Sequence, residues 1–217
     1  TCCAPRIFGL ASPGTHLLRA GPVMQIQTEI VLLPATAPEN RQYGKIPDRV
    51  CARPDLRCHP LHFPVQVWYN ARIREEALRQ IASFSPGRPL LAGFSKSALG
   101  AWNLTREAPA QFAGTLLFDA PVARPELPPW ETGDFYANDT EWQADQPLLN
   151  LDRFLERVPD THPLVLISGA LFHDEMTALS QALSARGREH DFLPRPHLAH
   201  RWDSGWLEEG LAVLQSR

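Results

Sequence analysis

The stretch most suggestive of chemistry is 89–102, which reads PLLAGFSKSALGAW. An apolar run leads into Ser95, and a segment with helical spacing follows at once. A serine at such a strand-to-helix turn projects its hydroxyl above the edge of a sheet, where it can act as a nucleophile. The turn requires small residues two positions before and after the serine, and Gly93 and Ser97 stand there. The pattern predicts a nucleophilic serine; the alternative is a serine that only caps the helix.

A serine hydroxyl is a poor nucleophile until a base removes its proton, and histidine is the usual base. The base is expected beyond the last strand, on a loop that returns to the serine, where both His200 and His197 lie. We predict His200, because the RWDSGW that follows it leads directly into a helix that can anchor the loop; His197 is the alternative. His59 and His62 form H-x-x-H without further acidic ligands, so we predict no metal site.

A third group should orient the imidazole and stabilise its charged form. Asp174 follows the strand expected at 163–169 and is the predicted acid, although an aspartate at a helix start is also a good N-cap. Asp119, at the end of the preceding strand, is the alternative acid; it could instead be a turn residue. The chain order Ser95, Asp174, His200 fits a nucleophile, acid and base.

The negative charge that develops on a carbonyl oxygen during acyl transfer needs two backbone N–H donors. One is expected from Lys96, directly after the nucleophile. The other is expected from Ala11 or Ser12, in the turn GLASPG after the first predicted strand. An ordinary Ser-Pro-Gly turn is the alternative interpretation of that segment.

The elements that must position these residues alternate between strands and helices. Buried or alternating apolar runs predict strands at 5–10, 23–34, 88–94, 114–121, 163–169 and 188–194. Apolar residues at helical spacing predict helices at 71–84, 97–107, 150–157, 174–187 and 203–215. The alternation predicts an α/β fold: a doubly wound, mostly parallel sheet of about six strands with helices on both faces.

The chain is expected to form a single domain over residues 1–217. Two long segments, 35–65 and 121–150, show no sustained period, and such segments in compact domains are often binding loops or lids. Aromatic residues lie in or beside them: Trp68, Tyr69, Trp130, Phe135, Tyr136 and Trp142. They could line an apolar acyl pocket or pack a lid onto the core.

Composition excludes several classes of partner. The net charge of −3 leaves no basic excess to neutralise nucleic-acid phosphates. The longest apolar runs are far shorter than the ~20 residues of a membrane-spanning helix. The compartment stays open: we expect a cytoplasmic location, unless Cys51 and Cys58 form a disulfide, which would indicate a secreted protein.

Four motifs together resemble the α/β-hydrolase superfamily: GFSKSALGA, LLFDAP, the strand followed by FHDEMTALSQALSARG, and HRWDSGW. The chain is most similar to bacterial esterases of the esterase D-like kind, from about residue 5 to the C-terminus apart from the two long segments. The resemblance implies a minimal α/β-hydrolase fold and a serine carboxylesterase without a cofactor. Ser95 would be its nucleophile, His200 its base and Asp174 its acid, and a small-molecule ester or related acyl compound its substrate.

Two alternatives share this fold. The first is a catalytically inactive scaffold that binds a ligand or a partner, which the serine at position 97 in place of glycine motivates. The second is an acyltransferase, which would form the same acyl-enzyme and pass the acyl group to an acceptor other than water.

Overall fold

We describe residues 1, 27–35, 46, 48–84, 87–129 and 132–216 of a computed structural model of the chain. Their centre is a six-stranded sheet in the order β2-β1-β3-β4-β5-β6, and every neighbouring pair of strands is parallel. The strands are β1 (Thr28–Leu33), β2 (Leu56–Pro60), β3 (Leu90–Phe94), β4 (Gly114–Phe118), β5 (Leu164–Ile167) and β6 (Asp191–Leu193). The predicted α/β class is confirmed.

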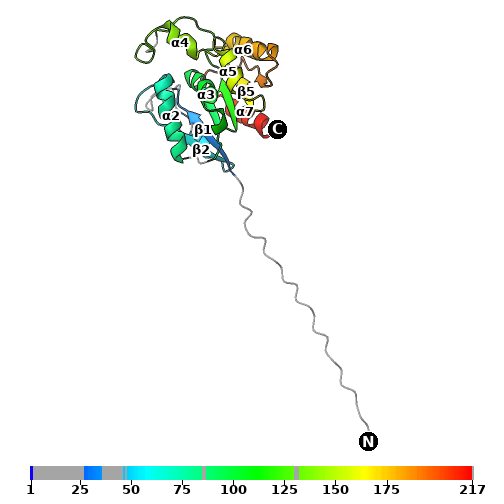
Figure 1. The fold of residues 1–217 in the computed structure, drawn as a ribbon. Helices are drawn as coiled ribbons and strands as arrows, with labels where there is room; N and C mark the ends of the chain where they lie inside the picture. Colours follow the sequence, from blue (N-terminus) through cyan, green and yellow to red (C-terminus); the bar gives the residue numbers. More distant parts are fainter. Residues whose placement is uncertain (2–26, 36–45, 47, 85–86, 130–131, 217) are drawn as a thin grey trace.

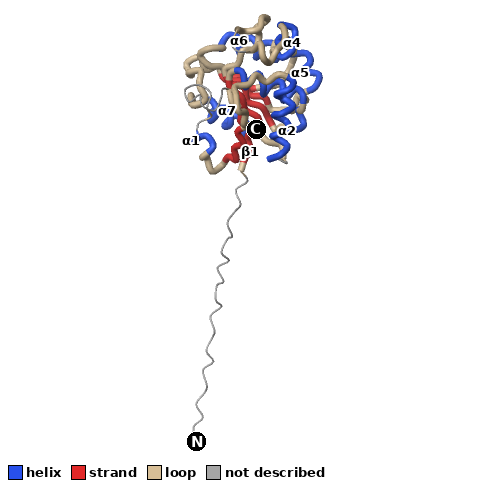
Figure 2. Tube along the Cα trace, turned by 90° about the vertical axis from the view of Figure 1, so that its left-hand side faces the viewer, coloured by secondary structure: helices blue, strands red, loops and turns tan. Residues whose placement is uncertain are grey.

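Helices cover both faces of this sheet (Figures 1 and 2). They are α1 (Asp48–Cys51), α2 (Ala71–Phe84), α3 (Lys96–Glu107), the 3-10 helix η1 (Pro109–Gln111), α4 (Asp139–Asp145), α5 (Leu151–Arg157), α6 (His173–Ala185) and α7 (Trp206–Gln215). One core cluster joins the sheet to α2, α3, α5 and α6, and a second joins its other face to α7.

The central strands are apolar throughout because both of their faces are covered. Successive side chains of a strand point to opposite faces. In β4, Leu116 packs in the cluster that contains Trp206 of α7, and Leu117 in the cluster that contains Trp102 of α3. Neither leucine is exposed to solvent. The carboxyl ends of β3, β4 and β5 therefore lie at one edge of a rigid, two-sided core.

The predicted helices and central strands agree with the structure, and the helix expected at 71–84 has these bounds. The prediction that 35–65 is wholly loop is wrong, because α1 and β2 lie within it. β2 is an edge strand whose residues are mostly part-exposed, so it lacks an apolar run, and it ends at Pro60. The strand expected at 5–10 falls outside the described residues.

The segment 121–150 packs onto the core through its aromatic residues. The rings of Trp142 and Trp68 lie 5.4 Å apart, and those of Tyr136 and Trp142 lie 5.3 Å apart, both edge to face. All three side chains are buried. The prediction that 121–150 is wholly irregular is wrong, because α4 lies within it. These aromatic residues thus fasten the segment to the core; Trp130 falls outside the described residues.

Cys51 and Cys58 do not form a disulfide with each other in the structure. Burial, together with a side-chain hydrogen bond to Cys51, raises the pKa of the Cys58 thiol to about 12. Cys58 is therefore protonated at neutral pH. Across the described ranges, the structure contains no helix long and apolar enough to cross a membrane.

Candidate active site

Ser95 occupies a sharp turn between the end of β3 and the start of α3. Its backbone has φ 57° and ψ −127°, a conformation that residues other than glycine rarely adopt. The turn is held by a 2.9 Å hydrogen bond from the Ser95 N–H to the Phe118 carbonyl of β4. Such strain persists only where the surrounding structure imposes it.

Close packing explains the small residue that precedes the turn. A Cβ atom at Gly93 would lie 2.3 Å from the Ser97 carbonyl oxygen and 2.6 Å from the Ala98 Cα. These are backbone atoms, which cannot move aside as the end of a flexible side chain can. Only glycine fits where β3 and α3 approach each other this closely.

Ser97 stands where a second glycine is usual, and its side chain braces the turn. The Ser97 hydroxyl donates a 2.8 Å hydrogen bond to the Phe94 carbonyl, and it accepts a 2.9 Å hydrogen bond from the Phe94 N–H. Ser97 is fully buried. The hydroxyl therefore ties the first turn of α3 to the last residue of β3, on either side of Ser95.

His200 lies within hydrogen-bond distance of the serine. Its Nε2 atom is 3.1 Å from the Ser95 Oγ atom. The imidazole centroid lies 4.5 Å from the ring of Phe94 and 5.4 Å from that of Phe172. Only 12% of the His200 side chain is exposed to solvent. The two phenyl rings fix the plane of the imidazole and shield it from water.

The loop that carries His200 is anchored by tryptophan residues in the sequence that follows it. Trp202 and Trp206 are buried with ring centroids 5.0 Å apart, and Trp206 stacks on Phe118 of β4, also at 5.0 Å. The side chain of Arg49 on α1 donates a 2.7 Å hydrogen bond to the Asp203 carbonyl. The loop is thus fixed to the sheet and to α1.

Asp119 holds the other nitrogen of the imidazole. Its Oδ2 atom lies 2.6 Å from His200 Nδ1. The same buried carboxylate accepts hydrogen bonds from the backbone N–H groups of Gly169, Leu171 and Phe172 at 2.9, 3.2 and 2.8 Å. Burial raises the pKa of Asp119, but the hydrogen bond and charge of His200 and the hydrogen bonds from the Phe172 and Leu171 N–H groups outweigh it and lower the pKa below its ordinary value. Asp119 is therefore an anion at neutral pH.

This arrangement corrects the predicted acid. Asp174 lies exposed in the first turn of α6 and does not orient the imidazole. The turn after β5 does not supply the acid; it supplies backbone N–H groups that donate hydrogen bonds to the Asp119 carboxylate. This turn approaches Asp119 so closely that position 169 must be glycine, because a Cβ atom there would lie 2.5 Å from Asp119 Oδ2. The signal in the sequence was that Asp119 directly follows β4, just as Ser95 directly follows the neighbouring strand β3.

No family model matches the chain, and no curated protein sequence matches it. Solved structures do match. The fluorophosphonate-binding serine hydrolase F of Staphylococcus aureus, with substrate bound, is 15% identical with a TM-score of 0.62, over 95% of this chain and 89% of that one. S-formylglutathione hydrolase from Staphylococcus aureus is 14% identical with a TM-score of 0.54, over 90% and 85% of the two chains.

A third match is the capsule O-acetyltransferase of Neisseria meningitidis serogroup A, 11% identical with a TM-score of 0.59, over 88% of this chain and 87% of that one. At such identities the similarity concerns the fold. The chain has the α/β-hydrolase fold. In this fold the nucleophile follows a central strand at a strained turn, as Ser95 follows β3 here.

Four further residues were predicted to belong to the site: His197, Ala11, Ser12 and Lys96. His197 is exposed on the turn before His200, and His200 is the histidine whose Nε2 atom lies beside Ser95 Oγ. Ala11 and Ser12 fall outside the described residues. Lys96 is the first residue of α3, and the first N–H groups of a helix have no acceptor within the helix. Its N–H is therefore the candidate for one oxyanion donor.

A second donor in α/β-hydrolases comes from a loop after another strand. β1 runs parallel to β3, and its last residue, Leu33, pairs with Gly93. The chain therefore leaves β1 beside the turn at Ser95, with Pro34 and the buried Ala35 as its next residues. This exit, at which the sequence analysis placed no donor, is a further candidate for the second donor, beside Ala11 and Ser12.

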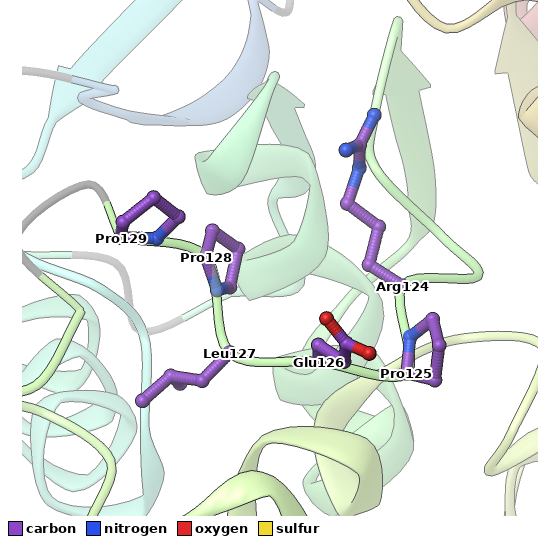
Figure 3. A pocket seen from close by; sticks show the side chains of 6 residues that line it. All are labelled: Arg124, Pro125, Glu126, Leu127, Pro128 and Pro129. Atoms are coloured by element: carbon purple, nitrogen blue, oxygen red, sulfur yellow. The ribbon is translucent and has the colours of Figure 1, made fainter.

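A hollow of about 430 Å³ lies along the segment from Arg124 to Pro129. Figure 3 shows the side chain of Arg124 and the ring of Pro128 on one side of this segment and Leu127 on the other. The Arg124 guanidinium lies 5.1 Å from the centroid of the Phe172 ring, which packs on His200. The ring of Phe172 thus contacts both Arg124, in the lining of this hollow, and the imidazole of His200.

The described residues include no group of three or more histidine, cysteine, aspartate or glutamate side chains that could hold a metal ion.

Proposed function

We propose that this protein is a serine hydrolase that cleaves carboxylic esters through an acyl-enzyme on Ser95. One observation carries the proposal: a continuous chain of contacts from Ser95 Oγ to His200 Nε2 at 3.1 Å and from His200 Nδ1 to Asp119 Oδ2 at 2.6 Å. A nucleophile, a base and a buried anion in this order are the groups that acyl transfer requires.

The buried anion determines which nitrogen of the histidine acts as the base. A carboxylate only accepts hydrogen bonds, so the proton of the neutral imidazole lies on Nδ1 and is donated to Asp119. The Nε2 lone pair then points at the Ser95 hydroxyl. As Ser95 Oγ bonds to the ester carbonyl carbon, His200 takes the hydroxyl proton, and Asp119 stabilises the imidazolium that forms.

The carbonyl oxygen gains negative charge in this step. The Lys96 N–H and an N–H of the segment after β1 are the donors we propose for it. His200 then returns its proton to the departing alcohol oxygen as the carbon–oxygen bond breaks, which leaves Ser95 acylated. A water molecule that gives its proton to His200 attacks the acyl carbonyl, and Ser95 recovers its proton as the acid departs.

The experiment is hydrolysis of p-nitrophenyl acetate by wild type, Ser95→Ala and Ser83→Ala. Ser83 is an exposed serine on α2 and serves as the matched control. We expect Ser95→Ala to lose at least about a thousandfold in kcat/KM while Ser83→Ala keeps the wild-type value. Equal rates for wild type and Ser95→Ala would favour the inactive scaffold. Acyl products on an added alcohol, in place of free acid, would indicate the acyltransferase.

A further inference from the structure

Two cysteine side chains from neighbouring elements meet beside the edge strand of the sheet. Cys51 is the last residue of α1, and Cys58 is the middle residue of β2. A side-chain hydrogen bond joins the two thiols. From this contact we propose that Cys51 and Cys58 are a reversible redox site, whose disulfide ties α1 to β2 and thereby steadies the loop that carries His200. This modification is separate from the esterase chemistry and goes beyond it.

The placement of the two sulfur atoms suits a disulfide. The S–S bond is about 2.05 Å long, and two cysteines whose side chains point apart cannot form it without movement of the backbone. The thiols of Cys51 and Cys58 already lie close enough to share a hydrogen bond. Cys51 is exposed and Cys58 is half-buried, so an oxidant in solution reaches Cys51 first.

The oxidant is a small disulfide such as glutathione disulfide. The thiolate of Cys51 attacks one sulfur atom of this disulfide and releases one molecule of glutathione, which leaves Cys51 in a mixed disulfide. Cys58 then loses its proton to solvent, attacks the sulfur of Cys51 and releases the second molecule of glutathione. Two protein thiols are oxidised to a disulfide, and one small disulfide is reduced to two thiols.

The formation of the mixed disulfide favours the closing step. Burial contributes most to the raised pKa of the Cys58 thiol, and the hydrogen bond and charge of Cys51 contribute the rest of the rise. The charge of Cys51 is absent once its sulfur is bonded to glutathione. The thiol of Cys58 therefore loses its proton more readily in the mixed disulfide than in the reduced protein.

The helix that ends at Cys51 contacts the active-site loop. Arg49, two residues before Cys51, donates a 2.7 Å hydrogen bond to the carbonyl of Asp203, three residues after His200. α1 has only four residues, and a helix this short is not stable by itself. A covalent link at its last residue therefore restricts the whole helix, and with it the position of Arg49.

β2 is the firmly held partner in this link. Its residues pair with β1 along the whole strand, and Cys58 lies opposite Ile30. Cys58 also packs against the core cluster that contains Trp202 and Trp206, the two tryptophans that anchor the loop of His200. The disulfide would thus fasten α1 to the part of the core on which this loop already rests.

The first test is chemical. Trypsin cuts after Arg49 and after Arg57, so it releases Cys51 and Cys58 on separate peptides. After folded wild type is incubated with glutathione disulfide, we expect mass spectrometry to find these two peptides linked, and to find them separate after dithiothreitol. Absence of the linked pair in the oxidised protein, or linkage of either peptide only to other cysteines, would overturn the proposal.

The second test is thermal unfolding. A disulfide that closes this short loop should raise the Tm of oxidised wild type by about 5 °C above that of the reduced protein. The control is Cys51→Ser, which changes an exposed residue and should have the same Tm under oxidising and reducing conditions. An equal Tm for oxidised and reduced wild type would contradict a disulfide that restricts α1.

The third test measures the coupling to the active-site loop by hydrogen exchange of residues 199–205. In wild type, oxidation should slow this exchange at least about threefold. Arg49→Met still forms the disulfide but lacks the hydrogen bond to Asp203, so oxidation should leave the exchange unchanged. Equal exchange in oxidised and reduced wild type, or equal slowing in Arg49→Met, would overturn the coupling. Neither result bears on the esterase proposal, which Ser95→Ala tests separately.

Discussion

The Oδ2 atom of Asp119 lies 2.6 Å from His200 Nδ1, although 81 positions separate the two residues in the chain. Asp119 has a positive φ of 46°, as Ser95 has one of 57°. Each follows directly on the end of its strand, and the two strands are neighbours in the sheet. Two strained residues at adjacent strand ends thus present the acid and the hydroxyl to one imidazole.

The first prediction concerns the acid. Asp119→Asn keeps the size of the side chain, but its amide can donate to His200 Nδ1, so the imidazole proton moves to Nε2 and the base is lost. We expect kcat to fall about 10³- to 10⁴-fold on p-nitrophenyl acetate. The remaining side-chain oxygen at position 119 can still accept hydrogen bonds from the backbone N–H groups of Gly169 and Phe172. Asp174→Asn is the control and should stay within about twofold of wild type. The opposite ranking would restore Asp174 as the acid.

The second prediction concerns the serine at position 97. Ser97→Ala removes both hydrogen bonds to Phe94, and we expect a loss of about 1–2 kcal/mol in the free energy of unfolding. Ser97→Gly restores the usual pattern of the turn but should lose about 1 kcal/mol more, because glycine is unfavourable inside a helix. Urea unfolding of the three proteins measures these differences. A glycine variant as stable as wild type would contradict the bracing role of the hydroxyl.

The third prediction concerns a buried ion-pair network that joins α2, α3 and α4. The Arg74 side chain donates hydrogen bonds to Asp145 at 2.6 Å and to Glu107 at 2.8 Å. Arg74→Met would leave the buried Asp145 carboxylate with one partner fewer, and we expect a loss of about 3–5 kcal/mol in the free energy of unfolding.

The matched control is Arg79→Met, also on α2. Arg79 forms an ion pair with Glu76 that is exposed to solvent, and such pairs contribute at most about 1 kcal/mol. Thermal and urea unfolding of both variants separates the two cases. Similar losses in Arg74→Met and Arg79→Met would show that the buried network does not fasten the segment containing α4.

The fourth prediction concerns pH. His162 is 4% exposed, with Nε2 3.0 Å from Thr115 Oγ1. Burial, and then the charges of Arg188 and Arg88, lower its pKa to about 4. An unfolded histidine titrates near pH 6.5, so between these values the unfolded chain binds more protons. The contribution of neutral, buried His162 to the free energy of unfolding is therefore complete above pH ~6.5 and is lost as the pH falls toward ~4.

Between pH 6.5 and 5 the lost stability amounts to roughly 2 kcal/mol. Urea unfolding at several pH values should show this loss in wild type and in His197→Gln, which replaces an exposed histidine. The loss should be smaller in His162→Gln. An equal loss of stability over this pH range in all three proteins would contradict the assignment to His162.

Much of the architecture was predictable because the central strands and the helices carry clear patterns. β3 and β4 are buried along their whole length and read as apolar runs, and α2 has its buried residues on one face. The positions of Ser95 and His200 followed from these elements. The edge strand β2 was missed, since its exposed residues give no apolar run.

The acid could not be chosen from the sequence, because Asp119 and Asp174 both follow buried strands. Three-dimensional details separate them: the positive φ of Asp119 and the close approach of Gly169 to its carboxylate. Neither feature can be predicted from the spacing of apolar and polar residues in the sequence. The role of Ser97 was equally hidden, since a small residue at that position predicts only that the turn has room.

Covalent labelling tests most directly whether Ser95 is a nucleophile activated by His200 and Asp119. A fluorophosphonate probe reacts covalently with such a serine, and peptide mass spectrometry locates the label. We expect labelling of Ser95 in folded wild type, much slower labelling of Asp119→Asn, and none at this site in Ser95→Ala or in heat-denatured protein. Folded wild type that stays unlabelled, or a label that forms equally well in Ser95→Ala, would contradict it.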